Sequence, residues 1–314
     1  MDTNKNTLLS SKLLPKFSKM QTKDMYQAIS YLIKENKKII KDIENLKKVS
    51  WKNFIYKIEE SDDKIAKVWA PIRHLNSVVN NPQIRKQYEK SLNLLTAHYG
   101  KVGQNKKLFS QYEIFYNENK TKLNANQKKL LTDILKGFKL SGVHLDSKKR
   151  KLFRGCQEKL ANLEANFEQN ILDSTNSWSL NYKTKKLLKG IPENALEIAA
   201  EVASSRGQKG YTLTLDQPCY MAVMTFAESQ ALRKILYLAY ASRASNKFPI
   251  KGHWDNTKNI EEILSLRQTM AQILGYKNYA EYSLATKMAK SSKEVVGFLN
   301  NLKTRPVYIT GFAV

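Results

Sequence analysis

Residues 24–46 have the sequence DMYQAISYLIKENKKIIKDIENL, and this stretch sets the character of the chain. Its apolar residues recur every three or four positions, as on the buried face of an amphipathic helix. They are Met25, Ile29, Leu32, Ile33, Ile40, Ile43 and Leu46. Glycine and proline, which interrupt helices, supply only 12 and 7 of the 314 residues, about half of their usual share. The sequence therefore predicts a mainly α-helical protein with long helices.

The segments that follow carry the same spacing together with signals for helix starts and ends. Ser50 can cap the helix after it, and Asn81-Pro82 places a capping residue directly before a proline in the first turn. Gly142 suits the end of a helix, and Asp146 can cap a long one. Further helices are predicted at 192–206, 229–242, 256–274 and 278–288, and after the capping-box pair Ser291 and Glu294.

One region departs from the helical spacing. Residues 178–182 (WSLNY) and 211–215 (YTLTL) alternate along the chain, which is typical of half-buried strands. We expect a small two-stranded β insertion near residues 178–216 within an otherwise helical, elongated multi-helix body. No repeat or low-complexity linker divides the chain, although residues 246–255 are turn-like.

The formal net charge of +25 favours an acidic partner or nucleic acid at first sight. Only 9 of the 53 basic residues are arginine, however, and the chain holds 26 asparagines. Arginine is the residue that makes paired contacts to bases and phosphates. We therefore interpret the charge as background composition, and we do not expect nucleic acid as a partner.

We expect this chain to be neither a membrane protein nor a secreted protein. No apolar stretch approaches the roughly 20 residues that a membrane span needs, so no membrane partner is expected. The first six residues, MDTNKN, do not resemble a signal peptide. The two cysteines, Cys156 and Cys219, fit a reducing, cytoplasmic setting, in which we expect both to be small buried apolar residues.

No catalytic centre is visible in the residues themselves. The four histidines are His74, His98, His144 and His253, and no two share a helix face. The His-Glu-x-x-His zinc signature, a nucleophile elbow and phosphate-binding glycine loops are all absent from the sequence. We interpret the adjacent carboxylates Glu59-Glu60, Asp62-Asp63 and Glu261-Glu262 as solvated charge, and the aromatic residues Trp51, Trp69, Tyr88 and Phe167 as core.

Two series of short segments nevertheless resemble a known family. The longer series comprises TLTLDQPCY (212–220), QALR (230–233), YLAYASRAS (237–245), EEILSLR (261–267), AQILGY (271–276) and SLATKMA (283–289). The earlier series comprises LPKFSK (14–19), PIRHLNSV (71–78) and LSG (140–142). In this order they resemble the N-terminal half of the thimet oligopeptidase family of zinc metallopeptidases, over roughly residues 8–306.

The resemblance implies a nearly all-α molecule whose two halves enclose a narrow channel that admits short peptides, including released signal peptides. In the family, zinc is bound by the two histidines of His-Glu-x-x-His and a following glutamate. The resemblance therefore implies proteolysis of short peptides by a zinc metalloendopeptidase, a class in which the metal polarises the scissile carbonyl and activates water.

The sequence departs from the family after Pro306, where the zinc-bearing half would follow. Residues 307–314 (VYITGFAV) are uncharged and β-prone. We expect residues 1–306 to be the helical N-terminal portion and 307–314 to be an aberrant tail. No residue is assigned a catalytic, cofactor-binding or metal-binding role, and this truncated chain is expected to bind no zinc and to be inactive alone. A separately encoded C-terminal half is a possible partner, and a basic helical binding module for nucleic acid or acidic partners is the alternative.

Overall fold

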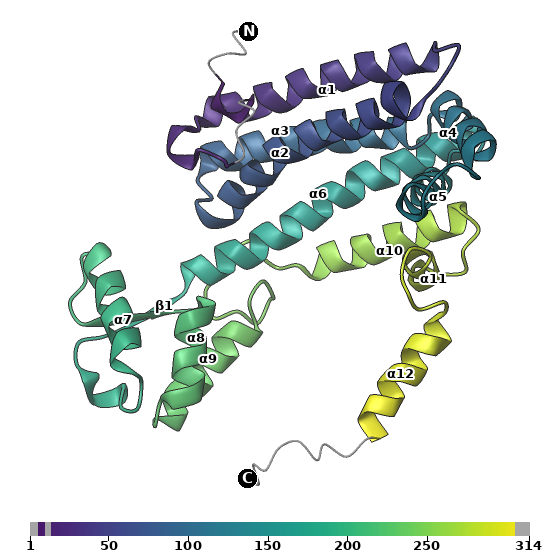
Figure 1. Cartoon of the computed structure of the whole chain (residues 1–314). Helices are drawn as coiled ribbons and strands as arrows, with labels where there is room; N and C mark the ends of the chain where they lie inside the picture. The colour runs from purple at the N-terminus through teal and green to yellow at the C-terminus, as the bar shows by residue number, and fades with distance from the viewer. Residues whose placement is uncertain (1–5, 10–13, 305–314) are drawn as a thin grey trace. The chain divides into compact units, whose positions relative to one another are not determined.

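The computed structural model describes residues 6–9 and 14–304 of the chain (Figure 1). The expected aberrant tail at 307–314 lies outside these residues. The helices are α1 (Thr22–Glu44), α2 (Tyr56–Val78), α3 (Pro82–Val102), α4 (Lys106–Asn119), α5 (Ala125–Leu140), α6 (Ser147–Ser177), α7 (Glu193–Ser205), α8 (Gln217–Phe226), α9 (Gln230–Ala241), α10 (Thr257–Ile273), α11 (Tyr279–Leu284) and α12 (Ser292–Thr304). The two strands are β1 (Ser179–Tyr182) and β2 (Tyr211–Thr214). The mainly helical fold with one small sheet is thus confirmed, and it is consistent with the N-terminal part of the thimet oligopeptidase fold.

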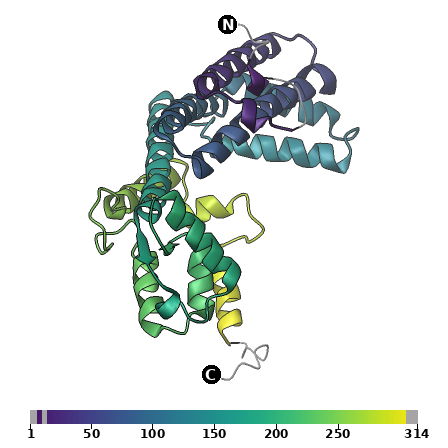
Figure 2. The ribbon, with the colours of Figure 1, turned by 90° about the vertical axis from the view of Figure 1, so that its left-hand side faces the viewer.

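The chain divides into two compact units, residues 1–162 with 265–314 and residues 163–264. In the first unit, α1 packs against both α2 and α3, and the three helices lie side by side in both views (Figures 1 and 2). The apolar residues of the opening stretch line the interior of this bundle, where Ile29 and Ile33 are 0% and 2% exposed. A second core cluster gathers around Phe54, Tyr112 and Leu131, which come from the segment before α2, from α4 and from α5.

The second unit is built around the β pair. The strands are antiparallel, with Leu180 opposite Leu213 and Asn181 opposite Thr212. Leu213 and Leu215 pack into a core with residues of α7, α8 and α9. The insertion therefore forms where the alternating pattern predicts it, and α7 lies between the two strands in the sequence.

The residues predicted to start and end helices make the expected contacts. The Ser50 hydroxyl accepts from the Asn53 amide, Asn81 accepts from Ile84, and Asp146 accepts from Lys149, so each caps a helical segment. Gly142 has a positive φ of 80° just after α5, a conformation that favours glycine. Ser291 accepts from the Glu294 amide as a capping box requires, whereas the Glu294 carboxylate accepts from the Lys290 amide.

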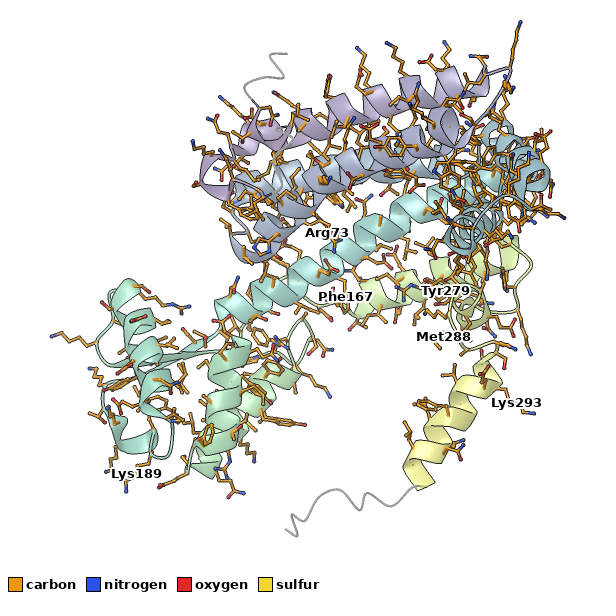
Figure 3. All side chains as sticks on the ribbon, viewed as in Figure 1. Arg73, Phe167, Lys189, Tyr279, Met288 and Lys293 are labelled. Atoms are coloured by element: carbon orange, nitrogen blue, oxygen red, sulfur yellow. The ribbon has the colours of Figure 1, made fainter. Side chains whose placement is uncertain are left out.

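Three parts of the helix prediction need correction. The helix expected over 278–288 ends at Leu284, and Met288 is 99% exposed (Figure 3), so the last predicted turn has nothing to pack against. The helix expected directly after Ser50 starts with a five-residue π-helical turn, Trp51–Ile55, before α2. Helices α4 and α8 were not predicted, although Asn105 caps α4 by accepting from the Leu108 amide and Pro218 lies in the first turn of α8.

Candidate functional site: a groove on the α8–α9 hairpin

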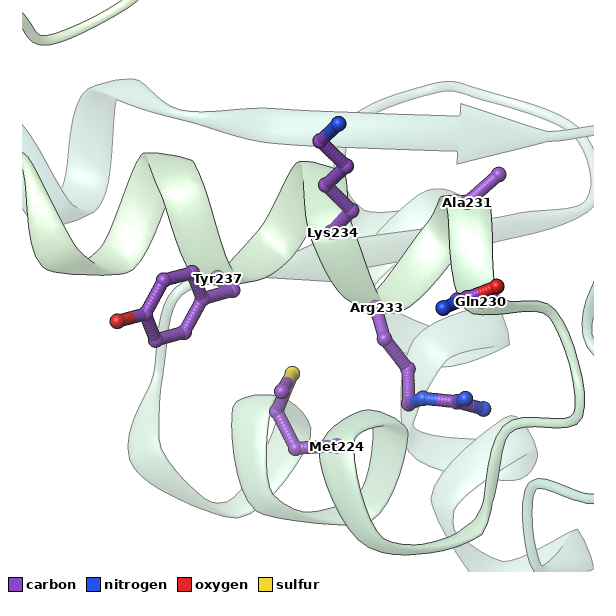
Figure 4. A pocket seen from close by; sticks show the side chains of 6 residues that line it. All are labelled: Met224, Gln230, Ala231, Arg233, Lys234 and Tyr237. Atoms are coloured by element: carbon purple, nitrogen blue, oxygen red, sulfur yellow. The ribbon is translucent and has the colours of Figure 1, made fainter.

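A groove of about 610 Å³ lies on the hairpin formed by α8 and α9 in the second unit (Figure 4). Met224 lies on α8, and the other lining residues lie on α9. They are Gln230, Ala231, Arg233, Lys234 and Tyr237. This volume is within the range of about 300–1,000 Å³ that is usual for ligand sites.

Two braces hold α8 and α9 on either side of the groove. At one end, Tyr220 of α8 stacks on Tyr240 of α9 with ring centroids 3.9 Å apart and planes at 15°. The Arg243 guanidinium lies 3.6 Å from the centre of the Tyr240 ring and also donates to the Thr175 hydroxyl. Burial raises the pKa of Tyr220, with smaller contributions from Tyr240 and Tyr237, so this phenol stays neutral near pH 7.

At the other end, the turn between the helices is fixed by its backbone contacts. Arg233 donates to the carbonyls of Ala227 and Glu228, and the Glu228 amide donates to the carbonyl of Lys189. Gly190 has a φ of 86° and lies so close to Phe226 that a Cβ would be 2.2 Å from its carbonyl oxygen. The groove is therefore set between two rigid supports.

Helix α9 is apolar on its outer side as well as on its inner side. Leu232, Leu236 and Ala239 are buried, whereas Tyr237 and Leu238 are 53% and 55% exposed. Neighbouring exposed apolar side chains of this kind often mark an interaction surface. The outer face of α9 is thus a surface that some ligand or partner would be expected to contact.

The four histidines do not form a metal site. His98 is 3% exposed and its Nε2 lies 2.8 Å from the Asn36 oxygen, while His74 packs its ring against Phe17. Burial first, and then Lys37 and Lys101, lower the pKa of His98 to about 4. Nowhere in 6–9 and 14–304 do three or more His, Cys, Asp or Glu side chains gather in a way that could hold a metal ion. The donor set that zinc requires does not match these residues, and we derive no chemistry through a metal.

A buried polar network in the first unit corrects one sequence interpretation. The Asn36 amide donates to the Ser61 hydroxyl at 2.9 Å and to the Asp62 carboxylate at 3.0 Å, and Tyr99 donates to the same carboxylate. Burial raises the pKa of Asp62 to about 6, although the bonds from Tyr99 and Asn36 oppose the shift. The interpretation of Asp62 as solvated charge was wrong, because the residue faces α1 and α3 and is half-buried.

The remaining predictions on single residues are confirmed only in part. Cys219 and Phe167 are half-buried and not fully buried, and Phe167 belongs to none of the core clusters of the described residues. Cys156 is buried and Cys219 half-buried, and burial raises the pKa of both thiols. Trp69 and Tyr88 stack 5.0 Å apart beside the core of the helical bundle. Trp51 packs beside the second core cluster, and Phe167 on α6 is half-buried (Figure 3).

Sequence reasoning did not identify the groove. It used residues 230–233 and 237–245 only to establish a resemblance. The available signal was the run of apolar residues on opposite sides of α9, which follows from helical spacing alone. No helix in the described part of the chain is both long and apolar enough to cross a membrane.

Two family models match this chain. Residues 29–150 match the N-terminal domain of neurolysin and thimet oligopeptidase, and residues 223–309 match peptidase family M3. The first match covers the helical bundle, and the second includes the groove. In these two stretches the chain is therefore similar to the M3 class of peptidases.

Within that class, the chain is similar to oligopeptidase A. It is 38% identical to oligopeptidase A of Haemophilus influenzae and 37% identical to that of Escherichia coli, in each case over 96% of this chain and 44% of the relative. It is also 32% identical to a probable cytosolic oligopeptidase A of Arabidopsis thaliana over 92% of this chain and 42% of the relative. The chain thus spans less than half the length of the curated relatives that it matches.

Proposed function

We propose that this chain provides the N-terminal portion of an oligopeptidase A-like zinc endopeptidase that hydrolyses short peptides. The similarity to oligopeptidase A extends over 96% of the chain and supports this assignment. On this proposal the zinc-bearing portion comes from the part of the relatives that this chain does not match, so the 314 residues bind no zinc and do not cleave peptides alone.

The observation that carries the proposal is the uncovered apolar surface in the M3-matched region. Helix α12 presents a stripe in which Phe298, Leu299 and Leu302 are 61%, 55% and 51% exposed. These residues follow Val295 at helical spacing, so they lie on one face. Contiguous apolar surface of this kind marks an interaction site. We infer that the stripe packs against the remaining M3 portion, whether that portion is joined to this chain or encoded separately.

We also propose a reducing, cytoplasmic setting. Both cysteines are free thiols. A reducing compartment is where free buried thiols are normally kept in that state.

A complementation assay tests the proposed function. The purified chain is incubated with an internally quenched short peptide and zinc, alone and together with the portion of an Escherichia coli oligopeptidase A that lies beyond the matched region. We expect no cleavage by the chain alone and chelator-sensitive cleavage by the mixture. Chelator-sensitive cleavage by the chain alone would contradict its proposed inactivity, and an inactive mixture in which the two parts bind would contradict the assignment.

A variant of α12 makes the assay specific. Leu299→Asp places a charge in the apolar stripe and should weaken association of the two parts and reduce activity of the mixture by about tenfold or more. The matched control is Leu152→Asp on α6, where the replaced side chain is 54% exposed. Equal loss in both variants would show that the stripe is not the contact surface.

A further inference from the structure

The lining of the α8–α9 groove combines an apolar floor with positive charge. Met224, Ala231 and the ring of Tyr237 supply apolar surface, and Arg233 and Lys234 supply two cations. Gln230 is the remaining lining residue, so among the described residues no carboxylate lines the groove. A ligand that matches this lining has an apolar group beside a negative charge.

The two cationic side chains differ in how they are held within the protein. Arg233 is fixed by its bonds to the carbonyls of Ala227 and Glu228, which use one of its terminal nitrogens and leave the other free of hydrogen bonds within the described residues. Lys234 is exposed and takes part in none of the ion pairs found in the described residues. The Arg233 guanidinium can therefore accept an oxyanion through its other terminal nitrogen without first breaking an internal ion pair. Lys234 leaves α9 in the opposite direction and adds positive charge without reaching the same oxyanion (Figure 4).

The apolar part of the groove is open between α8 and α9. Met224 reaches from α8 toward α9, where Tyr237 and Arg233 lie one helical turn apart (Figure 4). Methionine adapts its shape to varied apolar groups, and tyrosine offers a rigid contact area at low entropic cost. This arrangement suits an aliphatic or aromatic side chain of varied size.

We infer that the groove binds the C-terminal residue of a short peptide, with its apolar side chain between Met224 and Tyr237 and its free carboxylate on Arg233, while Lys234 adds positive charge nearby. The inference rests on the proposed function, since short peptides are the substrate class assigned there. It goes further by locating a binding subsite on this chain and by requiring an unblocked peptide C-terminus.

Charge complementarity favours a peptide over the other candidate occupants. A second copy of this chain would bring a net charge of +25 toward a groove that is itself cationic, and such like-charge contacts are disfavoured. The remaining M3 portion is the other alternative, and it is distinguished by adding it to the binding experiment.

The test is a calorimetric titration of the complete 314-residue chain with two peptides. Both are N-acetylated hexapeptides that end in leucine, one with a free carboxylate and one with a C-terminal amide. We expect the free acid to bind at least about tenfold more tightly than the amide at low ionic strength, with the difference shrinking as salt screens the charges. Equal affinity for the two peptides would overturn the inference.

Variants assign the contacts. Lys234→Gln should reduce affinity for the free acid by about threefold and leave the amide unchanged, because it removes a nearby positive charge and none of the groove's direct contacts. Tyr237→Ala should weaken both peptides equally, and circular dichroism should show its helical content unchanged. The matched control is Lys258→Gln, which alters an exposed lysine of α10 that does not line the groove and should bind like the unaltered chain.

Further outcomes separate this inference from the proposed function. The titrations do not require the zinc-bearing portion. If the peptides fail to bind, the proposed subsite is wrong, and the complementation assay still decides whether the proposed function is right. Loss of peptide binding on addition of the remaining M3 portion would show that this portion, and not a peptide, occupies the groove. Peptide binding that appears only where sedimentation shows dimers would assign the groove to a contact between copies.

Discussion

The regions matched by the two family models differ in how completely they bury their apolar side chains. In residues 29–150, five large apolar residues are substantially exposed: Tyr56, Val78, Val79, Tyr99 and Ile114. In the shorter described stretch 223–303, eleven are exposed: Phe226, Ile235, Tyr237, Leu238, Ile260, Leu264, Met288, Val296, Phe298, Leu299 and Leu302. The first region closes its own core, whereas the second has an apolar surface that the described residues leave uncovered.

This contrast predicts different stabilities for the two regions. The helical bundle buries its apolar faces internally, and the Asn36 network pairs Ser61, Asp62 and His98 inside it. The 223–303 stretch buries the inner side of α9 but exposes its outer side and the stripe of α12. Substitutions in the closed core should therefore cost far more stability than substitutions on the uncovered surface.

The largest effect is expected in the core of the first region. Phe54 is fully buried and lies 4.5 Å from Tyr112 and 6.0 Å from Phe115 between ring centroids. Phe54→Ala should lower the free energy of unfolding by about 3–5 kcal/mol, because it removes these contacts and leaves a cavity. Urea denaturation followed by circular dichroism measures this loss. A loss below about 1 kcal/mol would mean that the first region is less tightly packed than the contrast requires.

The second effect tests whether the buried side of the M3-matched region is packed as closely as the core of the first region. Gly190→Ala would place a methyl group 2.2 Å from the Phe226 carbonyl oxygen at a φ of 86°. The clash adds to the roughly 1–2 kcal/mol that a left-handed conformation costs a residue with a Cβ, so we expect a loss of about 2–4 kcal/mol. Gly207→Ala, with a φ of 67° and open space around it, is the control and should cost only about 1 kcal/mol. Equal losses in urea denaturation would show that the contact with Phe226 is not tight.

The sequence alone predicts much of both regions. The spacing from Met25 to Leu46, the caps at Asn81 and Asp146 and the alternation at 211–215 follow from local physics, and each was confirmed. Helix 278–288 was predicted too long because its pattern assumed a surface to pack against. The burial of Asp62 was missed because adjacent carboxylates reveal nothing about the helices opposite them. The groove depends on how α8 and α9 pair, which no local pattern specifies.

The third effect concerns the polar network of the first region and its dependence on pH. The pKa of Asp62 is raised from 3.8 to about 6, so its contribution to stability is present below pH 3.8 and is lost as the pH rises through 6. The pKa of His98 is lowered from 6.5 to about 4, so its contribution is present above pH 6.5 and is lost as the pH falls through 4. Between about pH 4 and 6 the Asp62 contribution to the free energy of unfolding falls with rising pH and the His98 contribution rises. The two changes oppose each other, so this network should leave the free energy of unfolding nearly constant over that range.

Single variants should uncover each slope. Asp62→Asn leaves His98, so the free energy of unfolding should rise with pH from 4 to 6.5, whereas His98→Gln leaves Asp62, so it should fall from about pH 4 to 6. After allowance for partial solvent screening we expect about 1–2 kcal/mol in each direction. Urea denaturation across this pH range measures both slopes. Two variants with slopes of the same sign would contradict the assignment of the network.

The smallest effect on stability is expected at the exposed stripe of α12. Leu299→Ser should change the free energy of unfolding by no more than about 0.5 kcal/mol, because the side chain is already 55% exposed. Binding of a fluorescent apolar dye and self-association in sedimentation should nevertheless fall, since the stripe is contiguous with Phe298 and Leu302. The control is Leu152→Ser on α6, where the leucine is 54% exposed and no other large apolar side chain of that helix is exposed to this extent among the described residues. If both variants reduced dye binding equally, exposure alone and not the continuity of the stripe would explain the surface, and the contrast between the two regions would lose its functional meaning.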